Sequence, residues 1–165
     1  MYWEDDWCGD ELCWCVGIKN VVHSVMVLVD GPGECAVHTE KPVWERISAG
    51  IDRVFARGGR VTLEIRKPAD SYIRYLGMEA LPGQYRLLVS NNTTEHREGL
   101  YEWWEPGDAP YRGVLYYGDD AFDARKVCND PWVAKLAFAE LFWTGDLAVS
   151  VPTMRSWWDP KRWEE

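Results

Sequence analysis

The sequence predicts a single α+β domain, in which two main helices pack on an antiparallel β-meander sheet. Three observations carry this prediction. Apolar residues recur at helical spacing around 43–55, and a second apolar segment around 131–143 lies between helix start and stop signals. Between these segments, apolar and polar residues alternate with the period of two that is typical of strands. The chain of 165 residues is also long enough to bury a substantial core within one domain.

The first expected strands lie within residues 12–29, which are rich in β-branched and aromatic side chains. The sequence DGPG at 30–33 predicts a turn, and residues 34–39 then return as the partner strand. The next segment has the spacing of a helix, capped by Thr39 and ended by Gly58-Gly59. Its recurring apolar residues are Val43, Ile47, Ile51, Val54 and Phe55.

A meander of four or five strands follows. Residues 60–66 alternate strictly, and 75–80 pairs with 84–90 across a Pro-Gly turn. A second Pro-Gly turn predicts that 100–105 pairs with 111–118.

The second helix is predicted to begin at Pro131, with Asp130 as its N-cap, and to end at Thr144-Gly145. It is apolar nearly all round, so we expect it to be well buried. The tail, residues 150–165, contains two prolines and three tryptophans and is expected to wrap over the sheet.

The net charge of −9 is concentrated in two blocks. Residues 1–15 contain five acids and no base, and residues 91–123 contain eight acids and two bases. Such a field repels nucleic acids and membrane surfaces and attracts basic proteins. No apolar run is long enough for a membrane helix, and the acidic start does not resemble a signal peptide, so we expect a cytoplasmic protein.

The common catalytic templates are absent, including the glycine-rich dinucleotide and phosphate loops, HExxH and GxSxG. We therefore expect no enzymatic activity and no cofactor. Asp119, Asp120 and Asp123 are interpreted as solvated acids of a loop after a strand. A small hydrolase that uses carboxylates or a metal stays open as a less favoured alternative, because partners can come from distant strands.

A metal site is also considered. Cys13 and Cys15, together with Cys35 and His38, could supply four zinc ligands. However, residues 35 and 38 of a regular strand point to opposite faces, and Cys-x-Cys is not the usual zinc spacing. We expect no metal, although the sequence does not decide the question.

Four local sequences, GGRVTLEI, MEALPGQYRLLV, YYGDDAFDARKVCND and FAELFWTGDL, resemble small bacterial immunity proteins of polymorphic toxin systems. The chain is similar in particular to the first immunity-protein family and its uncharacterised relatives, over residues 43–147. This resemblance implies a non-enzymatic inhibitor that binds a co-produced toxin in the cytoplasm. The sequence departs from the pattern at both ends, in residues 1–15 and in the SWWDPKRW tail.

The predicted partner is therefore a cognate toxin with a basic surface. The acidic charge favours a toxin that acts on nucleic acids or nucleotides, but the sequence specifies neither the toxin's chemistry nor which acidic block binds it. Acidic side chains would meet its basic cleft, and tryptophans would be apolar anchors. The candidate residues are Trp3, Asp5, Asp6, Trp7, Asp10, Glu11, Glu95, Glu98, Glu102, Trp103, Trp104, Glu105, Asp108, Asp119 and Asp120. An acidic adaptor that binds another basic protein is the main alternative, and the oligomeric state is not specified.

Overall fold

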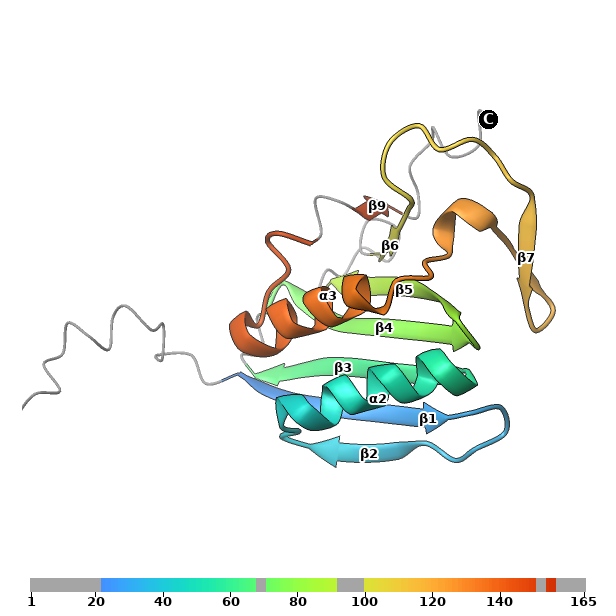
Figure 1. The fold of residues 1–165 in the computed structure, drawn as a ribbon. Helices are drawn as coiled ribbons and strands as arrows, with labels where there is room; N and C mark the ends of the chain where they lie inside the picture. Colours follow the sequence, from blue (N-terminus) through green and yellow to red (C-terminus); the bar gives the residue numbers. More distant parts are fainter. Residues whose placement is uncertain (1–21, 68–70, 92–99, 151–153, 157–165) are drawn as a thin grey trace, which may run out of the picture.

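Seven strands form one antiparallel sheet in the order β2-β1-β3-β4-β5-β6-β9 (Figure 1). A computed structural model of the chain describes residues 22–67, 71–91, 100–150 and 154–156. The strands are β1 (His23–Asp30), β2 (Val37–Glu40), β3 (Gly59–Lys67), β4 (Ile73–Leu81), β5 (Gln84–Asn91), β6 (Leu100–Trp103) and β9 (Met154–Ser156).

Two helices, α2 (Trp44–Arg57) and α3 (Pro131–Thr144), lie side by side on one face of this sheet (Figure 1). Helix α2 ends at Gly58, whose φ of 81° is readily adopted only by glycine. Asp130 begins α3 as predicted, because its carboxylate accepts a hydrogen bond from the Trp132 N–H. The expected α+β architecture, with two helices on an antiparallel sheet, is confirmed.

The hydrophobic core lies between the sheet and the two helices. Val61, Leu63 and Ile65 of β3 point into it, which confirms the alternation expected for residues 60–66. Tyr85 of β5 is fully buried, and its hydroxyl donates to the Asp130 carbonyl at 2.6 Å and accepts from the Ala134 N–H at 3.0 Å. This side chain therefore fixes the start of α3 on the sheet.

Along each strand, the residues that alternate with the core residues point to the opposite side of the sheet, away from the two helices. We call this side the open face. A small two-stranded sheet, β7 (Val114–Tyr117) and β8 (Asp120–Asp123), lies over part of it. The short 3-10 helix η1 (Ala124–Lys126) follows β8. After η1, Cys128 pairs with Tyr85 of β5 through two backbone hydrogen bonds. Helix α3 then begins on the other face of the sheet.

Two local predictions are wrong. Thr39 belongs to β2 and does not cap α2, whose N-cap is Val43 without a side-chain hydrogen bond. The strand expected at 111–118 does not pair with β6. It pairs with β8, while β6 lies between β5 and β9.

The burial of α3 is also different from the prediction. Ala134, Phe138 and Leu141 are buried, but Trp132 and Trp143 are 65% and 68% exposed. The described part of the tail forms the edge strand β9 and does not cover a face of the sheet.

Candidate functional site

The predicted partner-binding residues fall into two groups. Those that lie outside the described residues are Trp3, Asp5, Asp6, Trp7, Asp10, Glu11, Glu95 and Glu98. The described ones are Glu102, Trp103, Trp104, Glu105, Asp108, Asp119 and Asp120. These come from β6, from the loop after it and from the turn of the hairpin that β7 and β8 form. All of them except Trp103, whose side chain lies on the α3 side of the sheet, are on or near this hairpin.

Glu102 is not available to a partner, because it is only 1% exposed. Its Oε1 lies 2.7 Å from Lys126 Nζ and its Oε2 lies 3.4 Å from Arg86 Nη2. Burial works to lower the pKa of Arg86, and the nearby Glu102 and Glu79 carboxylates oppose this shift. Arg86, Glu102 and Lys126 form a buried charged cluster, and the prediction that Glu102 meets a toxin is corrected.

The two adjacent tryptophans, for which the sequence left open which one faces outward, differ in exposure. Trp103 is half-buried against the core, whereas Trp104 is 5% exposed. The Trp104 ring is contacted by cationic side chains, with Arg155 at 4.6 Å and Lys126 at 5.1 Å from its centroid. Trp104 is thus an internal packing residue, and its prediction as an exposed anchor is corrected.

The inner side of the hairpin is fixed to the open face by aromatic contacts. The rings of Tyr117 and Phe122 meet edge to face at 5.9 Å, and the Arg86 guanidinium lies 3.4 Å from the Phe122 centroid. Arg125 closes the base of the hairpin, because its side chain pairs with Asp123 at 2.7 Å. Its carbonyl also accepts from the Glu105 N–H at 2.7 Å.

Burial is the main influence on the two titratable side chains of this inner layer. It raises the pKa of Tyr117 to about 12, with Arg86 opposing and Glu79 adding to the shift. Burial also works to raise the pKa of Asp123, but hydrogen bonds from the Arg125 side chain and backbone outweigh it. The pKa of Asp123 therefore lies below its ordinary range, and this carboxylate is ionised at neutral pH.

The outer side of the hairpin and its preceding loop carry exposed aromatic and acidic side chains. Tyr111 and Tyr116 are 64% and 63% exposed. Three exposed aspartates of this region have no ion-pair partner among the described residues. We define the hairpin surface as Asp108, Tyr111, Val114, Tyr116, Asp119 and Asp120. Glu105 is half-buried and pairs with Arg112, so it contributes less free charge.

The two tyrosines were missed by the sequence reasoning, although a signal was present. In YGDD, Gly118 and Asp119 form a two-residue turn, and Gly118 has the positive φ of 62° that such turns require. Reading the turn would have placed Asp120 in a strand and not in a loop. Alternation along β7 would then have separated the exposed Tyr116 from the buried Tyr117.

The zinc prediction is tested only in part, because Cys13 and Cys15 lie outside the described residues. Cys35 is exposed in the β1–β2 connection and His38 is exposed in β2. Within the described ranges, no three His, Cys, Asp or Glu side chains are grouped closely enough to hold a metal ion.

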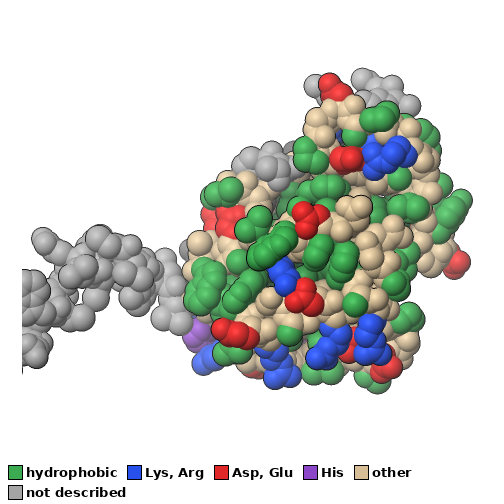
Figure 2. Space-filling view, viewed as in Figure 1, with side chains coloured by type: hydrophobic (Ala, Val, Ile, Leu, Met, Phe, Trp, Pro, Cys, Tyr) green, Lys and Arg blue, Asp and Glu red, His purple; other side chains and the backbone are tan. Residues whose placement is uncertain are grey.

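The helical side of the protein also exposes apolar side chains. Figure 2 shows hydrophobic side chains gathered over α3, where Trp132, Leu136 and Trp143 are each more than 60% exposed. Their spacing of four and seven residues places them on one helix face. None of the described helices has the length and apolar character needed to cross a membrane.

Comparisons with known proteins bear on the fold alone. No protein-family model and no curated protein matches this chain. A solved structure, that of a hypothetical protein from Neisseria gonorrhoeae, is similar with a TM-score of 0.57 and 10% sequence identity. The likeness covers 78% of this chain and 92% of the other. A similar arrangement of helices and sheet is therefore found in that protein.

Proposed function

We propose that this protein is an immunity protein, which binds a co-produced toxin in the cytoplasm and blocks its active-site cleft. The hairpin surface is the observation that carries the proposal. It combines two largely exposed tyrosines with three aspartates that have no ion-pair partner among the described residues. Tyrosine is a frequent energetic anchor of protein interfaces, and uncompensated carboxylates attract a basic cleft.

The way in which the hairpin is held supports this role. Its inner side is packed on Arg86, and its base is closed by Arg125. A surface that is fixed before binding loses little conformational entropy on association. Tyr111 and Tyr116 thus take the anchoring role that the sequence assigned to Trp103 and Trp104.

The resemblance to immunity proteins implies a cognate toxin and leaves its chemistry open, and the acidic surface favours a toxin that acts on nucleic acids or nucleotides. Such enzymes bind phosphates with basic clefts, to which an acidic surface is complementary. The first test is co-expression with the product of the adjacent upstream gene. That product should be toxic alone and harmless beside this protein. If it is harmless alone, or remains toxic beside this protein, the proposal is wrong.

The surface is tested separately with two variants. Tyr111→Ala/Tyr116→Ala should weaken binding of that gene product by at least tenfold, on the order expected for interface anchors. Asp108→Asn/Asp119→Asn/Asp120→Asn should mainly slow association and flatten its salt dependence.

A matched control removes three acids elsewhere. Glu34, Glu40 and Glu45 are exposed and have no ion pair within the described ranges. Replacing all three by glutamine changes the net charge by the same amount. This variant should leave association nearly unchanged. If both triple variants behave alike, only net charge matters, and the hairpin surface is not the interface.

A further inference from the structure

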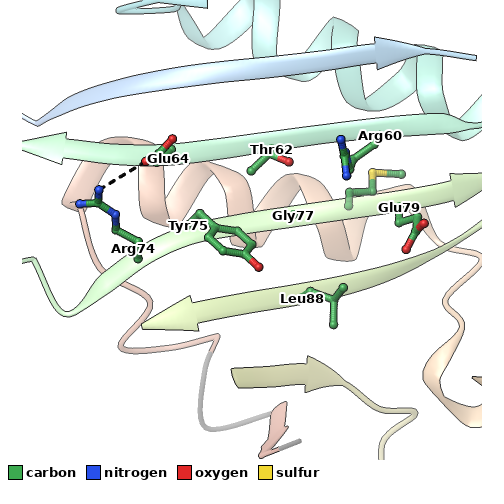
Figure 3. A pocket seen from close by; sticks show the side chains of 9 residues that line it. Arg60, Thr62, Glu64, Arg74, Tyr75, Gly77, Glu79 and Leu88 are labelled. Atoms are coloured by element: carbon green, nitrogen blue, oxygen red, sulfur yellow. Dashed lines mark ion pairs between the residues drawn. The ribbon is translucent and has the colours of Figure 1, made fainter. Parts of the chain in front are cut away.

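The open face contains a hollow of about 410 Å³ centred on Gly77 of β4 (Figure 3). Strand register explains the hollow. Gly77 lies opposite Thr62 on β3 and opposite Leu88 on β5, with Tyr75 and Glu79 two residues away along β4. Because side chains project from all four neighbours and none projects from Gly77, the sheet is indented at this point.

The glycine at this position has no internal explanation. Gly77 does not have a positive φ, and the register of β4 is continuous from Tyr75 to Leu81. A Cβ built on Gly77 would lie 3.7 Å from Thr62 Oγ1 and 3.7 Å from Tyr75 Cε2, which are ordinary contacts. Alanine would therefore fit without strain. Glycine within a strand weakens it, and such residues often mark the close approach of a ligand.

Two other glycines show the contrast. A Cβ on Gly59 would lie 2.1 Å from the Val29 carbonyl oxygen, so the fold itself requires glycine there. A Cβ on Gly50 would have contacts as ordinary as those at Gly77, with Leu28, Met26 and Val61 at 3.6 to 3.8 Å, but it would be enclosed between α2 and the sheet. At Gly77 the space beyond the Cβ position is the open hollow.

The charged side chains around the rim of the hollow indicate the sign of the charge that a ligand would carry. Glu64 pairs with Arg66 at 3.2 Å and with Arg74 at 3.6 Å. Glu79 pairs with Arg86 at 3.5 Å. Arg60 is exposed and has no ion-pair partner in the described part of the chain. Both acids are thus compensated, and the uncompensated charge of the rim is positive.

The walls indicate the shape of the ligand. Figure 3 shows the Tyr75 ring lying along the sheet toward Gly77, with Leu88 on the other side and Arg60 at the far end. A flat group can approach the bare backbone of Gly77 and contact the aromatic ring in an offset arrangement. The volume also falls within the range of about 300–1,000 Å³ that is typical of small-molecule sites.

We propose that this hollow binds a small planar aromatic anion, with its ring on the Gly77 floor and its anionic group at Arg60. A guanidinium recognises carboxylate and phosphate groups with paired hydrogen bonds. The site is separate from the hairpin surface, so it does not depend on the proposed binding of a toxin.

The test uses three probes with the ¹⁵N-labelled full chain in NMR titrations. They are 1-naphthoate, its neutral amide 1-naphthamide, and the non-aromatic anion cyclohexanecarboxylate. 1-Naphthoate should bind most tightly and should shift the amide signals of Thr62, Gly77 and Leu88. Loss of the charged contact at Arg60 should weaken binding about five- to tenfold in the neutral amide.

Variants then locate the site. Gly77→Val places a branched side chain on the floor against which the ring would lie, and should abolish saturable binding. Arg60→Gln should weaken 1-naphthoate to the level of 1-naphthamide. Leu136→Gln on α3 is the control for adsorption to the exposed apolar helix face, and should bind as the wild type. Gly77→Ala adds a single methyl group to the same floor, which the structure accommodates, and should weaken 1-naphthoate by less than Gly77→Val does.

Three results would overturn the proposal. In the first, no probe binds, or the charged and neutral probes bind equally. In the second, the shifted signals belong to α3. In the third, Gly77→Val folds and binds 1-naphthoate like the wild type. If Gly77→Val does not fold, Gly77→Ala and Arg60→Gln decide the question.

Discussion

The Arg86 guanidinium carbon lies 3.4 Å from the centroid of the Phe122 ring. Arg86 belongs to β5 of the main sheet and Phe122 to β8 of the hairpin, so this contact joins the two sheets. It also covers the buried cluster in which Arg86 and Lys126 share Glu102. The hairpin therefore both presents an outer surface and keeps water from a charged cluster.

Replacing Phe122 by alanine tests this coupling. Phe122→Ala removes a half-buried ring and its contact with the Arg86 cation, so we expect the free energy of unfolding to fall by about 2–3 kcal/mol. Phe122→Leu keeps most of the apolar volume and should lose only about 1 kcal/mol. Urea unfolding followed by tryptophan fluorescence measures both. Equal stability of the wild type and Phe122→Ala would show that the hairpin contributes little to the fold.

Glu102 should be the most sensitive carboxylate of the described part of the chain. Glu102→Gln leaves Arg86 and Lys126 buried with less compensating charge, so a loss of about 3 kcal/mol is expected. Glu79→Gln is the matched control, because Glu79 also pairs with Arg86 but its side chain is 47% exposed. A pair of which one partner is half exposed to solvent should contribute less than the buried pair, about 1 kcal/mol. Chemical denaturation of the two variants should therefore separate them clearly. Similar losses would contradict the assignment of Glu102 to the interior.

Tyr117 offers a test with pH. Its hydroxyl is buried and has no hydrogen-bond partner among the described residues, so Tyr117→Phe should leave stability unchanged or raise it by about 1 kcal/mol at pH 7. The pKa of Tyr117 rises from 10.0 to about 12 on folding. The unfolded chain thus releases its proton first, and the fold loses stability from about pH 10 to pH 12.

Tyr117→Phe has no hydroxyl group that could lose a proton in this pH range. Its advantage over the wild type should grow above pH 10, by up to about 1.4 kcal/mol for each pH unit. Denaturant midpoints of both proteins at pH 7, 10 and 11 measure the difference. A constant difference across this range would mean that Tyr117 is not shielded from solvent.

The sequence correctly predicted the helices and strands that are determined by residues within or next to them. Asp130 and Gly145 delimit α3 through their own capping interactions, and strict alternation identified the buried side of β3. The pairing of β6 was missed because its second partner, β9, lies about fifty residues farther along the chain. A Pro-Gly turn indicates that the chain reverses, but it does not determine which strand the chain meets afterwards.

In the candidate site too, the features that sequence reasoning missed depend on residues far apart in the chain. In YEWWE, Glu102 and Glu105 look alike in sequence, yet Glu102 is buried by Arg86 and Lys126 from distant segments. Helix α3 gave no clue to its exposed face, because its apolar residues have no clear period. The exposure of Trp132 and Trp143 follows from where α2 and the sheet lie, which is a tertiary property.

Gly77 and Gly59 make a matched pair for the last prediction. Both belong to central strands, but the Cβ of an alanine would have ordinary contacts at Gly77 and would collide with the Val29 carbonyl at Gly59. Gly77→Ala should therefore raise the free energy of unfolding by about 0.5–1 kcal/mol, because alanine loses less backbone entropy on folding. Gly59→Ala should lower it by about 2 kcal/mol or more, since its φ of 121° is also unfavourable for alanine. Thermal and urea unfolding of the two variants measure this contrast. A stable Gly77→Ala would show that glycine at this position is not needed by the fold, whereas a destabilised one would reveal an internal reason for it.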